Sequence, residues 1–310
     1  MARELYVVSI GSTIFDLVAR APRVPHEGEV VVSTGLRFFH GGKGANRAIA
    51  LARLGARAAL ISAVGDDANG RFALEGLARN GVGTQWVKCT GEAATGCSWI
   101  AVLPSGNNAT WVDPAASLTL TPADVARARE VIRSADAVAA DLEVSLDAVE
   151  TALRLAHEAG KLTVLDAGPP GRCPPEILGL ADVVSPNEPE LEALTGERVS
   201  DIESAGRAAL KLLESGARTV VVKLGSAGAM LVTRDAREHF PAVKVDAVDP
   251  TGAGDAFTAA LTIRLAEGAD MAEAIRYANV AGALAVTRLG ALPSLPTRVE
   301  VESFRNGTQA

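Results

Sequence analysis

The sequence has few aromatic residues and no long apolar run, and these shortages limit what the protein can be. Phe, Trp and Tyr make up only 4% of the 310 residues. No run of about 18 uncharged apolar residues occurs, as a membrane-spanning helix would require. The opening MARELYVVSIGST carries Glu4 in a short apolar stretch and lacks the cleavage site of a secretion signal. We therefore expect no membrane partner and a cytoplasmic location.

Cysteine and positive charge are also scarce. Cys89, Cys97 and Cys173 are odd in number and form no C-x-x-C pair, which argues against a disulfide framework and a zinc site. The formal net charge is −7, whereas a protein that neutralises nucleic-acid phosphates normally has a basic patch. We expect no nucleic-acid partner, although local groups can still bind a small anion.

Short apolar runs alternate with helical patterns along most of the chain. The runs rich in Val, Ile and Leu are 5–11, 58–65, 135–141, 161–168, 181–187 and 218–225. The helical patterns cover 43–55, 67–80, 121–134, 145–159, 188–195, 203–215, 254–267 and 271–288. Nearly continuous apolar strands separated by helices are typical of a parallel sheet covered on both faces. The pattern predicts a doubly wound α/β sandwich.

Two stretches, 16–39 and 84–113, do not follow this alternation. The first is extended and contains two prolines, and the second reads as three short strands separated by turns. Five of the twelve aromatic residues, including all three tryptophans, gather there, namely Phe38, Phe39, Trp86, Trp99 and Trp111. A sheet this small needs a partner for its apolar face. That partner is a ligand site beneath a lid, a second subunit, or the parent domain.

The segment AVDPTGAGDAFTAALTIRLAEG, 247–268, places Gly252 and Gly254 at the start of what otherwise reads as an amphipathic helix. Glycine lets backbone N–H groups approach a ligand, and a helix N-terminus carries partial positive charge. The segment therefore suits an anion such as a transferred phosphate. Asp255, in the first turn, either only stabilises the helix or accepts a proton from a hydroxyl that attacks the phosphate. We favour the second interpretation.

The segment FFHGGKGANRAIALARLG, 38–55, is a second glycine-rich junction between a strand and a helix. Lys43 and Asn46 are three residues apart, so both can face one side of the helix start and bind hydroxyls or phosphate. A plain glycine-rich turn is the alternative. Lys43 is followed by Gly44, not by the Ser or Thr of a P-loop, and Phe257 stands where G-x-G-x-x-G needs glycine. A P-loop ATPase and a dehydrogenase are therefore disfavoured.

Together these segments resemble the two signatures of the ribokinase family of ATP-dependent carbohydrate kinases. GGKGANRAIALARLG and DPTGAGDAFTAAL carry the resemblance, and SPNEPELEALTG, VVVKLGSAG and AGALAVTRLGALPSLP occur in the expected order. The resemblance covers essentially the whole chain and implies one kinase domain over 1–310. The implied fold is a ribokinase-like three-layer α/β/α sandwich with a central, mostly parallel sheet. A small β-sheet lid would be formed by about 16–39 and 84–113.

The resemblance also implies an activity, cofactors and site residues. ATP would donate its γ-phosphate to a hydroxymethyl group of a small sugar, with Mg²⁺ and with K⁺ as a monovalent activator. Asp255 would be the base, and the N–H groups of Gly252, Ala253 and Gly254 the anion hole. The residues implied for the sugar are Asp16, Gly42, Lys43, Asn46, Glu143 and Asp255. Those implied for ATP and its Mg²⁺ are Asn187, Glu190, Lys223, Gly225, Ser226, Gly228, Gly254 and Asn279. Those implied for the monovalent cation, mostly through backbone carbonyls, are Asp249, Thr251, Ala285, Arg288, Gly290 and Ser294.

Only part of this set has support from the residues alone. Glu143 follows a predicted strand at its carboxyl end, which is where open α/β sheets bind ligands. Glu143 as a capping acid and Asn187 as a turn residue remain the alternatives. The cation loop contains no Cys or His, so no ligand spacing marks it. That site depends on the resemblance.

The acceptor sugar is the least determined feature. The tail AVTRLGALPSLP is most similar to the ribokinase branch, which implies D-ribose as acceptor and ribose 5-phosphate as product. However, GSTIFD has Ile14 where the pattern G-S-x-N-x-D has Asn, and losing that amide weakens recognition of a hydroxyl. The alternatives are a fructokinase, a 2-keto-3-deoxygluconate kinase or a nucleoside kinase of the same family. A non-catalytic sugar- or nucleotide-binding regulator is more remote, and the exposed lid aromatics predict a homodimer through the lid sheets.

Overall fold

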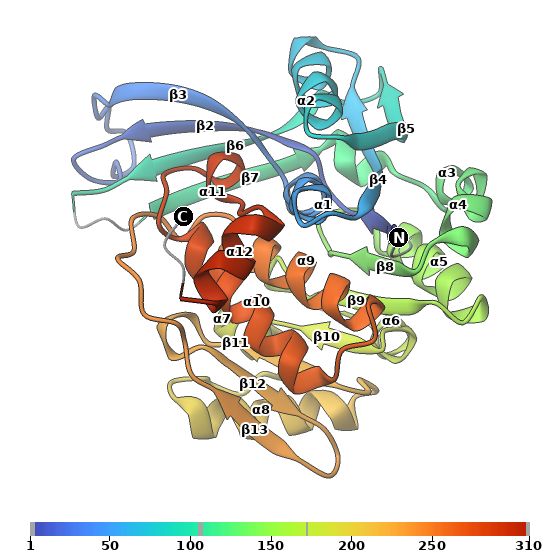
Figure 1. The fold of residues 1–310 in the computed structure, drawn as a ribbon. Coiled ribbons are helices and arrows are strands. Elements are labelled where there is room, and N and C mark those ends of the chain that lie inside the picture. The colour runs from blue at the N-terminus through green and yellow to red at the C-terminus, as the bar shows by residue number, and fades with distance from the viewer. Residues whose placement is uncertain (1–3, 105–107, 172, 308–310) are drawn as a thin grey trace.

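The centre of the molecule is a large, mostly parallel sheet (Figure 1). The computed structural model describes residues 4–104, 108–171 and 173–307, and within them nine strands form this sheet. The strands are β1 Tyr6–Ile10, β4 Arg57–Gly65, β5 Val82–Thr90, β8 Ala137–Ala140, β9 Leu162–Asp166, β10 Val183–Ser185, β11 Val220–Lys223, β12 Ala229–Val232 and β13 Arg237–Phe240. Their order is β13-β12-β11-β10-β9-β8-β1-β4-β5. All neighbours from β11 to β5 are parallel, and β12 and β13 add an antiparallel edge.

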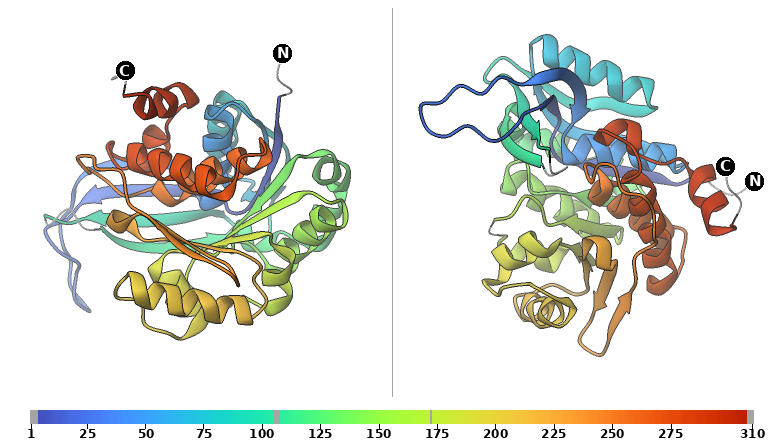
Figure 2. Two further views of the ribbon diagram at one scale, coloured as in Figure 1. Left: turned by 60° about the horizontal axis from the view of Figure 1, so that its bottom comes forward. Right: turned by 90° about the vertical axis from the view of Figure 1, so that its left-hand side faces the viewer.

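Helices cover both faces of this sheet, as the left-hand view of Figure 2 shows. One layer contains α1 Lys43–Arg53, α2 Ala68–Arg79, α9 Ala253–Ala266, α10 Met271–Ala285 and α12 Arg298–Arg305. The other contains α3 Pro122–Arg127, α4 Arg129–Ser134, α5 Leu146–Glu158, α6 Pro175–Leu180, α7 Glu188–Thr195 and α8 Ile202–Glu214. Alternate strand residues enter opposite cores, because successive side chains of a strand point to opposite faces. Val7 packs in the first core and Val8 in the second. The predicted α/β sandwich is confirmed.

A second, four-stranded sheet extends from one side of the body (Figure 1). Its strands are β2 Ile14–Arg20, β3 Thr34–Gly41, β6 Thr95–Val102 and β7 Asn108–Ala115, in the order β3-β2-β6-β7. The strand predicted at 84–90 does not belong to it. Those residues lie in β5, which pairs in parallel with β4 in the large sheet, so the placement of Trp86 in the lid was wrong. The physical reason is that β4, α2 and β5 form a β–α–β unit, in which the helix returns the chain so that β5 pairs in parallel with β4 in the same sheet.

Several helical expectations also need correction. The helix predicted over 121–134 is divided at Ala128 into α3 and α4, and the helix predicted to reach 288 ends at Ala285. The helix that starts at Ala253 is not amphipathic, because residues 255–263 are buried on every side between α1, α10 and the sheet. The sequence analysis missed β12, β13, α6, α12 and the short α11 Ala291–Ser294. Among the described residues, no helix is long and apolar enough to span a bilayer.

Candidate active site

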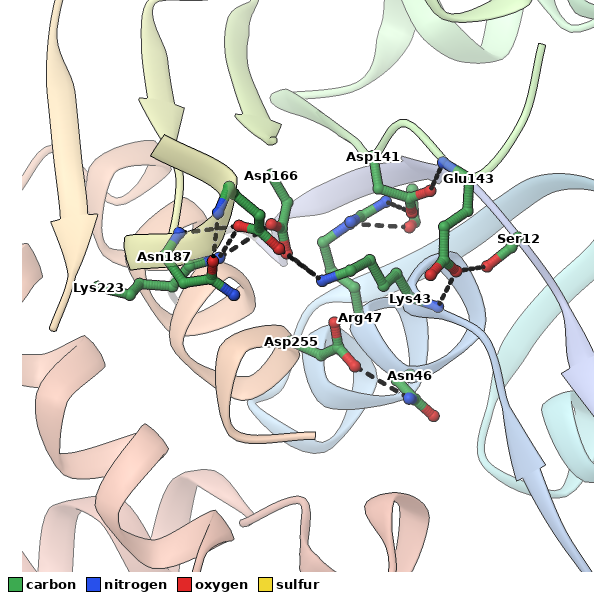
Figure 3. Close-up of polar contacts among 12 residues, drawn as sticks. Ser12, Lys43, Asn46, Arg47, Asp141, Glu143, Asp166, Asn187, Lys223 and Asp255 are labelled. Atoms are coloured by element: carbon green, nitrogen blue, oxygen red, sulfur yellow. Dashed lines mark hydrogen bonds and ion pairs between the residues drawn. The ribbon is translucent and has the colours of Figure 1, made fainter. Parts of the chain in front are cut away.

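The candidate site lies at the carboxyl ends of β1, β8, β9 and β11, where the N-terminus of α1 meets that of α9 (Figure 3). In the large sheet, β1 lies between β4 on one side and β8 on the other, so the strand order reverses at β1. Open α/β sheets bind ligands outside the strand ends at such a reversal of strand order. The fold therefore brings most of the predicted site residues to one place, although Asp16 and Asp255 are 239 residues apart in the chain.

The N-terminus of α9 leaves its backbone N–H groups without a side-chain partner, although the Ala253 N–H donates to the Pro250 carbonyl at 3.2 Å. Gly252 caps the helix with φ of 84°, and no side chain caps these groups. A Cβ at Gly254 would lie 3.7 Å from the Lys223 ammonium nitrogen, with no backbone atom close to it. Unpaired N–H groups, a helix dipole and a neighbouring ammonium are what an anionic group requires. The anion cradle predicted from Gly252, Ala253 and Gly254 is sterically open in the structure.

Asp255 is held at the edge of this cradle. Its side chain is 6% exposed, and its Oδ2 accepts a hydrogen bond of 2.9 Å from the Asn46 side-chain amide. Burial raises the pKa of Asp255 to about 6, although the neighbouring Lys43 and the Asn46 hydrogen bond lower it. A carboxylate with a pKa just below neutrality is ionised at pH 7 and basic enough to take a proton in a transition state.

The N-terminus of α1 is the second glycine junction. Gly42 precedes the helix with φ of 95°, and a Cβ there would lie 2.7 Å from the carbonyl oxygen of Ser12. A Cβ at Gly44 would lie 2.4 Å from the carbonyl carbon of Gly11. These positions exclude side chains because α1 packs directly on the end of β1. The close packing aims Lys43 and Asn46 into the site, as predicted.

Two further acids lie on the side of the site that faces the small sheet. Asp16 on β2 is 7% exposed and accepts a hydrogen bond of 2.5 Å from the Ser98 hydroxyl on β6. Burial raises its pKa to about 6. Glu143 follows β8 and accepts hydrogen bonds from the Ser12 hydroxyl and, at 3.2 Å, from the Lys43 backbone N–H. Burial raises the pKa of Glu143 as well.

On the opposite side, a cluster of charged groups surrounds Asp166 at the end of β9. Its Oδ1 accepts a hydrogen bond of 2.9 Å from the Lys223 ammonium, and its Oδ2 lies 3.7 Å from the Lys43 ammonium. Glu190 Oε1 is 3.5 Å from the same Lys43 nitrogen. Burial would raise the pKa of Asp166, but Lys223 and then Lys43 outweigh it and lower this pKa to about 2. The Lys43 side chain therefore points to this cluster, and only its backbone N–H contacts Glu143.

Asn187 and Glu190 hold each other in a reciprocal cap at the start of α7. Asn187 Oδ1 accepts from the Glu190 N–H at 2.9 Å, and Glu190 Oε2 accepts from the Asn187 N–H at 2.8 Å. The cap immobilises both side chains at the edge of the Asp166 cluster. Asn187 is therefore a helix cap, not the turn residue of the alternative interpretation. One pair of side chains both caps the helix and faces the site.

The residues predicted for the nucleotide lie around the turn from β11 to β12. Gly225 and Ser226 are exposed there, and a Cβ at Gly228 would lie 2.1 Å from the carbonyl oxygen of Phe240. Asn279 on α10 donates to the carbonyls of Phe240 and Pro241, at 3.2 and 3.4 Å. The structure thus brings Asn279 to the same loops as Gly228, next to Lys223 at the end of β11.

The residues predicted for a monovalent cation are only partly brought together. Asp249 Oδ1 accepts from the Thr251 N–H at 3.0 Å, and Oδ2 accepts from the Gly290 N–H at 2.8 Å. The Ser294 hydroxyl lies 3.4 Å from the Thr251 carbonyl oxygen. Ala285 ends α10, and the carbonyl of the next residue, Val286, accepts the Asp249 N–H at 3.1 Å. The Arg288 side chain instead turns to Glu300 on α12.

Comparison with known proteins assigns this site to a family. Residues 4–298 match the pfkB family carbohydrate kinases. The chain belongs to this family. It is 38% identical over 297 residues to a ribokinase of Staphylococcus aureus, covering 95% of this chain and 98% of that protein. It is 32% identical over 299 residues to a deoxyribokinase of Salmonella typhi, covering 96% and 97%. The solved structure of Arabidopsis thaliana ribokinase complexed with ribose and ATP superposes with a TM-score of 0.87 at 32% identity, covering 98% of each chain.

The charges in this pfkB family site fit a magnesium ion that arrives with a nucleotide. Asp166 Oδ2 is buried and has no hydrogen-bond partner among the described residues. Across residues 4–104, 108–171 and 173–307, no cluster of three or more His, Cys, Asp or Glu side chains could hold a metal. Mg²⁺ usually takes one or two carboxylates and completes its shell with substrate phosphates and water. Asp166 and Glu190 are suited to that arrangement.

The sequence analysis missed four side chains that shape this pfkB family site, Asp166, Ser98, Arg47 and Asp141. Asp166 lies within the predicted run 161–168 and is the last residue of β9, so the rule that ligands bind at strand carboxyl ends could have identified it. Ser98 was hidden because its contact with Asp16 depends on the pairing of β2 with β6. Arg47 and Asp141 are 94 residues apart, and nothing in the sequence links them.

Proposed function

We propose that this pfkB family carbohydrate kinase is an ATP-dependent ribokinase that converts D-ribose to ribose 5-phosphate. The observation that carries the proposal is Asp255, a buried carboxylate with a raised pKa beside the open N-terminus of α9. A phosphate at that N-terminus and a hydroxyl at Asp255 would be adjacent. The ribokinase relatives, which match this chain over nearly its whole length, support ribose as the acceptor.

In the proposed reaction, the sugar hydroxyl oxygen forms a bond to the γ-phosphorus while the bond from that phosphorus to the β-bridging oxygen breaks. Asp255 takes the hydroxyl proton, and ADP leaves. The N–H groups of Gly252, Ala253 and Gly254 stabilise the charge on the transferred group. The other hydroxyls are held by Asp16, Glu143, Asn46 and Gly42. Ionised carboxylates such as Asp16 and Glu143 accept the hydrogen bonds that a polyol donates.

The remaining site residues are assigned to the nucleotide and its ions. Lys43 and Lys223 neutralise phosphate charge. Burial alone would lower the pKa of Lys43, but Asp166 and then Glu190 raise it well above the usual range, so its ammonium stays charged. Mg²⁺ would be held by Asp166 and by Glu190 with Asn187, and it screens the phosphates when bound. Gly225, Ser226, Gly228 and Asn279 line the place for the base and sugar of ATP.

A monovalent activator, K⁺, is part of the proposal. The proposed oxygen ligands come from Asp249, Thr251, Gly290 and Ser294, which contact one another. We assign the backbone carbonyls of Ala285 and Arg288 to complete the set. The loop leads directly into the anion cradle, because Thr251 precedes Gly252. Ordering this loop would fix the position of the cradle without contact between the cation and the substrates.

The small sheet is proposed as both lid and dimer interface of a single kinase domain. Asp16 on β2 faces the site, so the sheet closes over the sugar from one side. Its other face exposes Phe38, Trp99 and Trp111, which are about half exposed at 53%, 48% and 49%. Large apolar side chains grouped on a surface mark interaction sites. A second copy of this sheet would cover them.

A second acceptor, 2-deoxy-D-ribose, is favoured by one observation. Ile14 and Asp16 point to the same face of β2, and Ile14 is 3% exposed. An isoleucine offers no hydrogen bond to a sugar hydroxyl, so the loss of one hydroxyl costs less here than in a site with an amide. The deoxyribokinase relative matches this chain over nearly its whole length.

The test is release of ADP from Mg-ATP with ribose, 2-deoxyribose, fructose, 2-keto-3-deoxygluconate and nucleosides, each with and without K⁺. Ribokinase activity predicts the highest kcat/KM on ribose. A higher kcat/KM on 2-deoxyribose would support the second acceptor, and preference for another sugar would reject both. No turnover on any acceptor, with retained ATP binding, would indicate a regulator instead.

A further inference from the structure

Behind the sugar side of the site, a charged pair is completely buried. Arg47 on α1 and Asp141 after β8 are each 0% exposed, and the guanidinium Nη2 lies 2.9 Å from Asp141 Oδ2 (Figure 3). Arg47 also donates to the Ile10 carbonyl at 2.8 Å and to the Ser9 hydroxyl at 3.1 Å. Neither residue has a role in the proposed phosphoryl transfer, since neither reaches the surface of the site.

A buried ion pair of this kind contributes little to the stability of the fold. Taking two charges out of water costs as much as their attraction returns, and apolar side chains of similar volume often stabilise a core equally well. Burial raises the pKa of Asp141 to about 7 although Arg47 opposes this. Arg47 Nη1 is also buried without a hydrogen-bond partner among the described residues. The pair therefore calls for a function other than stabilising the core.

Two hydrogen bonds connect Asp141 with the proposed sugar site. Asp141 Oδ1 accepts the backbone N–H of Glu143 at 3.0 Å. The Glu143 carboxylate in turn accepts the backbone N–H of Lys43 at 3.2 Å. Lys43 and Arg47 are one turn apart on α1, so the contacts form a closed ring from α1 to Asp141, to Glu143 and back to α1. A Cβ at Gly11 would lie 1.8 Å from Asp141 Oδ2, so this ring is packed directly against the end of β1.

We propose that Arg47 and Asp141 are positioning residues that set the distance between the Glu143 carboxylate and the N-terminus of α1, and thereby the affinity for the acceptor sugar. Asn46, which holds Asp255, lies on the same turn of α1. The ring thus connects Glu143, the proposed sugar-binding acid, to α1, the helix that also orients Asp255 through Asn46. The other ATP contacts lie on the opposite side of the site, around Asp166 and Lys223, and only Lys43 belongs to both groups, with its backbone N–H in the ring and its ammonium near Asp166. This inference rests on the proposed function for the identity of the sugar.

The test is the double variant Arg47→Met/Asp141→Leu, which removes both charges and keeps apolar volume. Isothermal titration gives Kd for ribose and for Mg-ADP, and thermal unfolding gives Tm. We expect Kd for ribose to rise by about tenfold or more, as after loss of a positioning hydrogen bond, while Kd for Mg-ADP stays within about twofold. Arg47→Lys keeps the charge but not the planar fork, so it should show an intermediate Kd for ribose.

The matched control is Arg264→Met/Glu273→Met, which removes a two-bond arginine–carboxylate pair between α9 and α10, with bonds of 2.9 and 3.1 Å, away from the site. It should leave both Kd values unchanged. A ribose Kd within about twofold of wild type in the double variant, or an equal loss of Mg-ADP binding, would overturn the inference. If the double variant fails to fold, an unchanged ribose Kd in Arg47→Lys overturns it. Failure of wild type to bind any sugar of the panel would reject the proposed function instead.

Discussion

The side-chain amide of Asn46 donates a hydrogen bond of 2.9 Å to Asp255, across 209 residues of sequence. This bond joins the two glycine-led helix starts, α1 and α9, at the point where chemistry is proposed. The other Asn46 amide atom, Oδ1, is buried and has no hydrogen-bond partner among the described residues. The amide is therefore held by the base on one side and leaves one acceptor for a hydroxyl on the other.

The first prediction concerns the pH dependence of catalysis. With a pKa of about 6, Asp255 is protonated below that pH and cannot take a proton, so kcat at saturating sugar should rise through about pH 6 and then level off. We choose kcat because kcat/KM would also report Asp16, the proposed sugar-binding acid, whose pKa is about 6 as well. The Asn46 hydrogen bond stabilises the ionised form. Asn46→Ala should therefore shift the midpoint of this profile to higher pH, as measured by steady-state kinetics from pH 5 to pH 8.

The matched control for that profile is Ser98→Ala, which removes the hydrogen bond to Asp16 rather than to Asp255. It should raise KM for the sugar while leaving kcat near the wild-type value. An unchanged midpoint in Asn46→Ala would show that the amide does not tune the base.

A second prediction separates strain from function in the anion cradle. Gly254→Ala meets no backbone atom and should keep the wild-type Tm, yet its methyl group enters the cradle and should lower kcat. Gly252→Ala places a side chain at φ of 84° and 3.1 Å from Ala291, so it should also lose roughly 1–2 kcal/mol of stability. Thermal unfolding and kinetics on both variants check this. Wild-type kcat in Gly254→Ala would contradict the assignment of the cradle.

A third prediction concerns the cation loop and has a readout independent of activity. If K⁺ binds the folded protein only, Tm rises with K⁺ concentration, by an amount equivalent to about 2.7 kcal/mol at 100 times Kd. Asp249→Ala removes the carboxylate that holds Thr251 and Gly290, so the K⁺-dependent increase in Tm should disappear. Choline chloride at equal ionic strength is the control salt. An equal rise in Tm with choline would indicate a general salt effect.

A fourth prediction concerns the exposed face of the small sheet. Trp111 on β7 pairs with Trp99 on β6, and both are about half exposed. Trp111→Asp should convert a dimer to a monomer in analytical ultracentrifugation, because a carboxylate cannot be buried in an apolar interface without a large cost. Val299→Asp changes an exposed apolar residue on α12 instead and should leave the dimer intact. A monomeric wild type would reject the interface.

The layered fold could be predicted because its signals are local. Apolar runs of strand length and glycine junctions at 42 and 252 can be read directly from neighbouring residues. The edge strand β13, Arg237–Phe240, was missed because it is largely exposed and has no apolar run. Its neighbour β12, Ala229–Val232, was missed although it is apolar and buried, because only four residues mark it. The assignment of β5 failed for another reason. Its place in the large sheet depends on its pairing with β4 after α2, and the composition of 84–90 does not show which strand it pairs with.

The site could be predicted only where a motif marks a residue. Asp255 and Asn46 lie in the two glycine-rich segments, so these motifs identified them as candidate site residues. Their direct contact could not be predicted, because it depends on how α1 and α9 pack. The same limit applies to Arg47, which reads as an ordinary surface residue of a helix yet is completely buried against Asp141.

The most direct test of the account is the phosphorylation rate of ribose by Asp255→Asn at pH 8, at saturating ribose and Mg-ATP. The variant keeps the shape of the side chain, so Kd for ribose and Mg-ADP by isothermal titration should remain near the wild-type values. Because the variant lacks the general base, its kcat should fall by a factor of about 10² to 10⁴. A wild-type kcat in Asp255→Asn would contradict the central claim that this carboxylate takes the proton of the attacking hydroxyl.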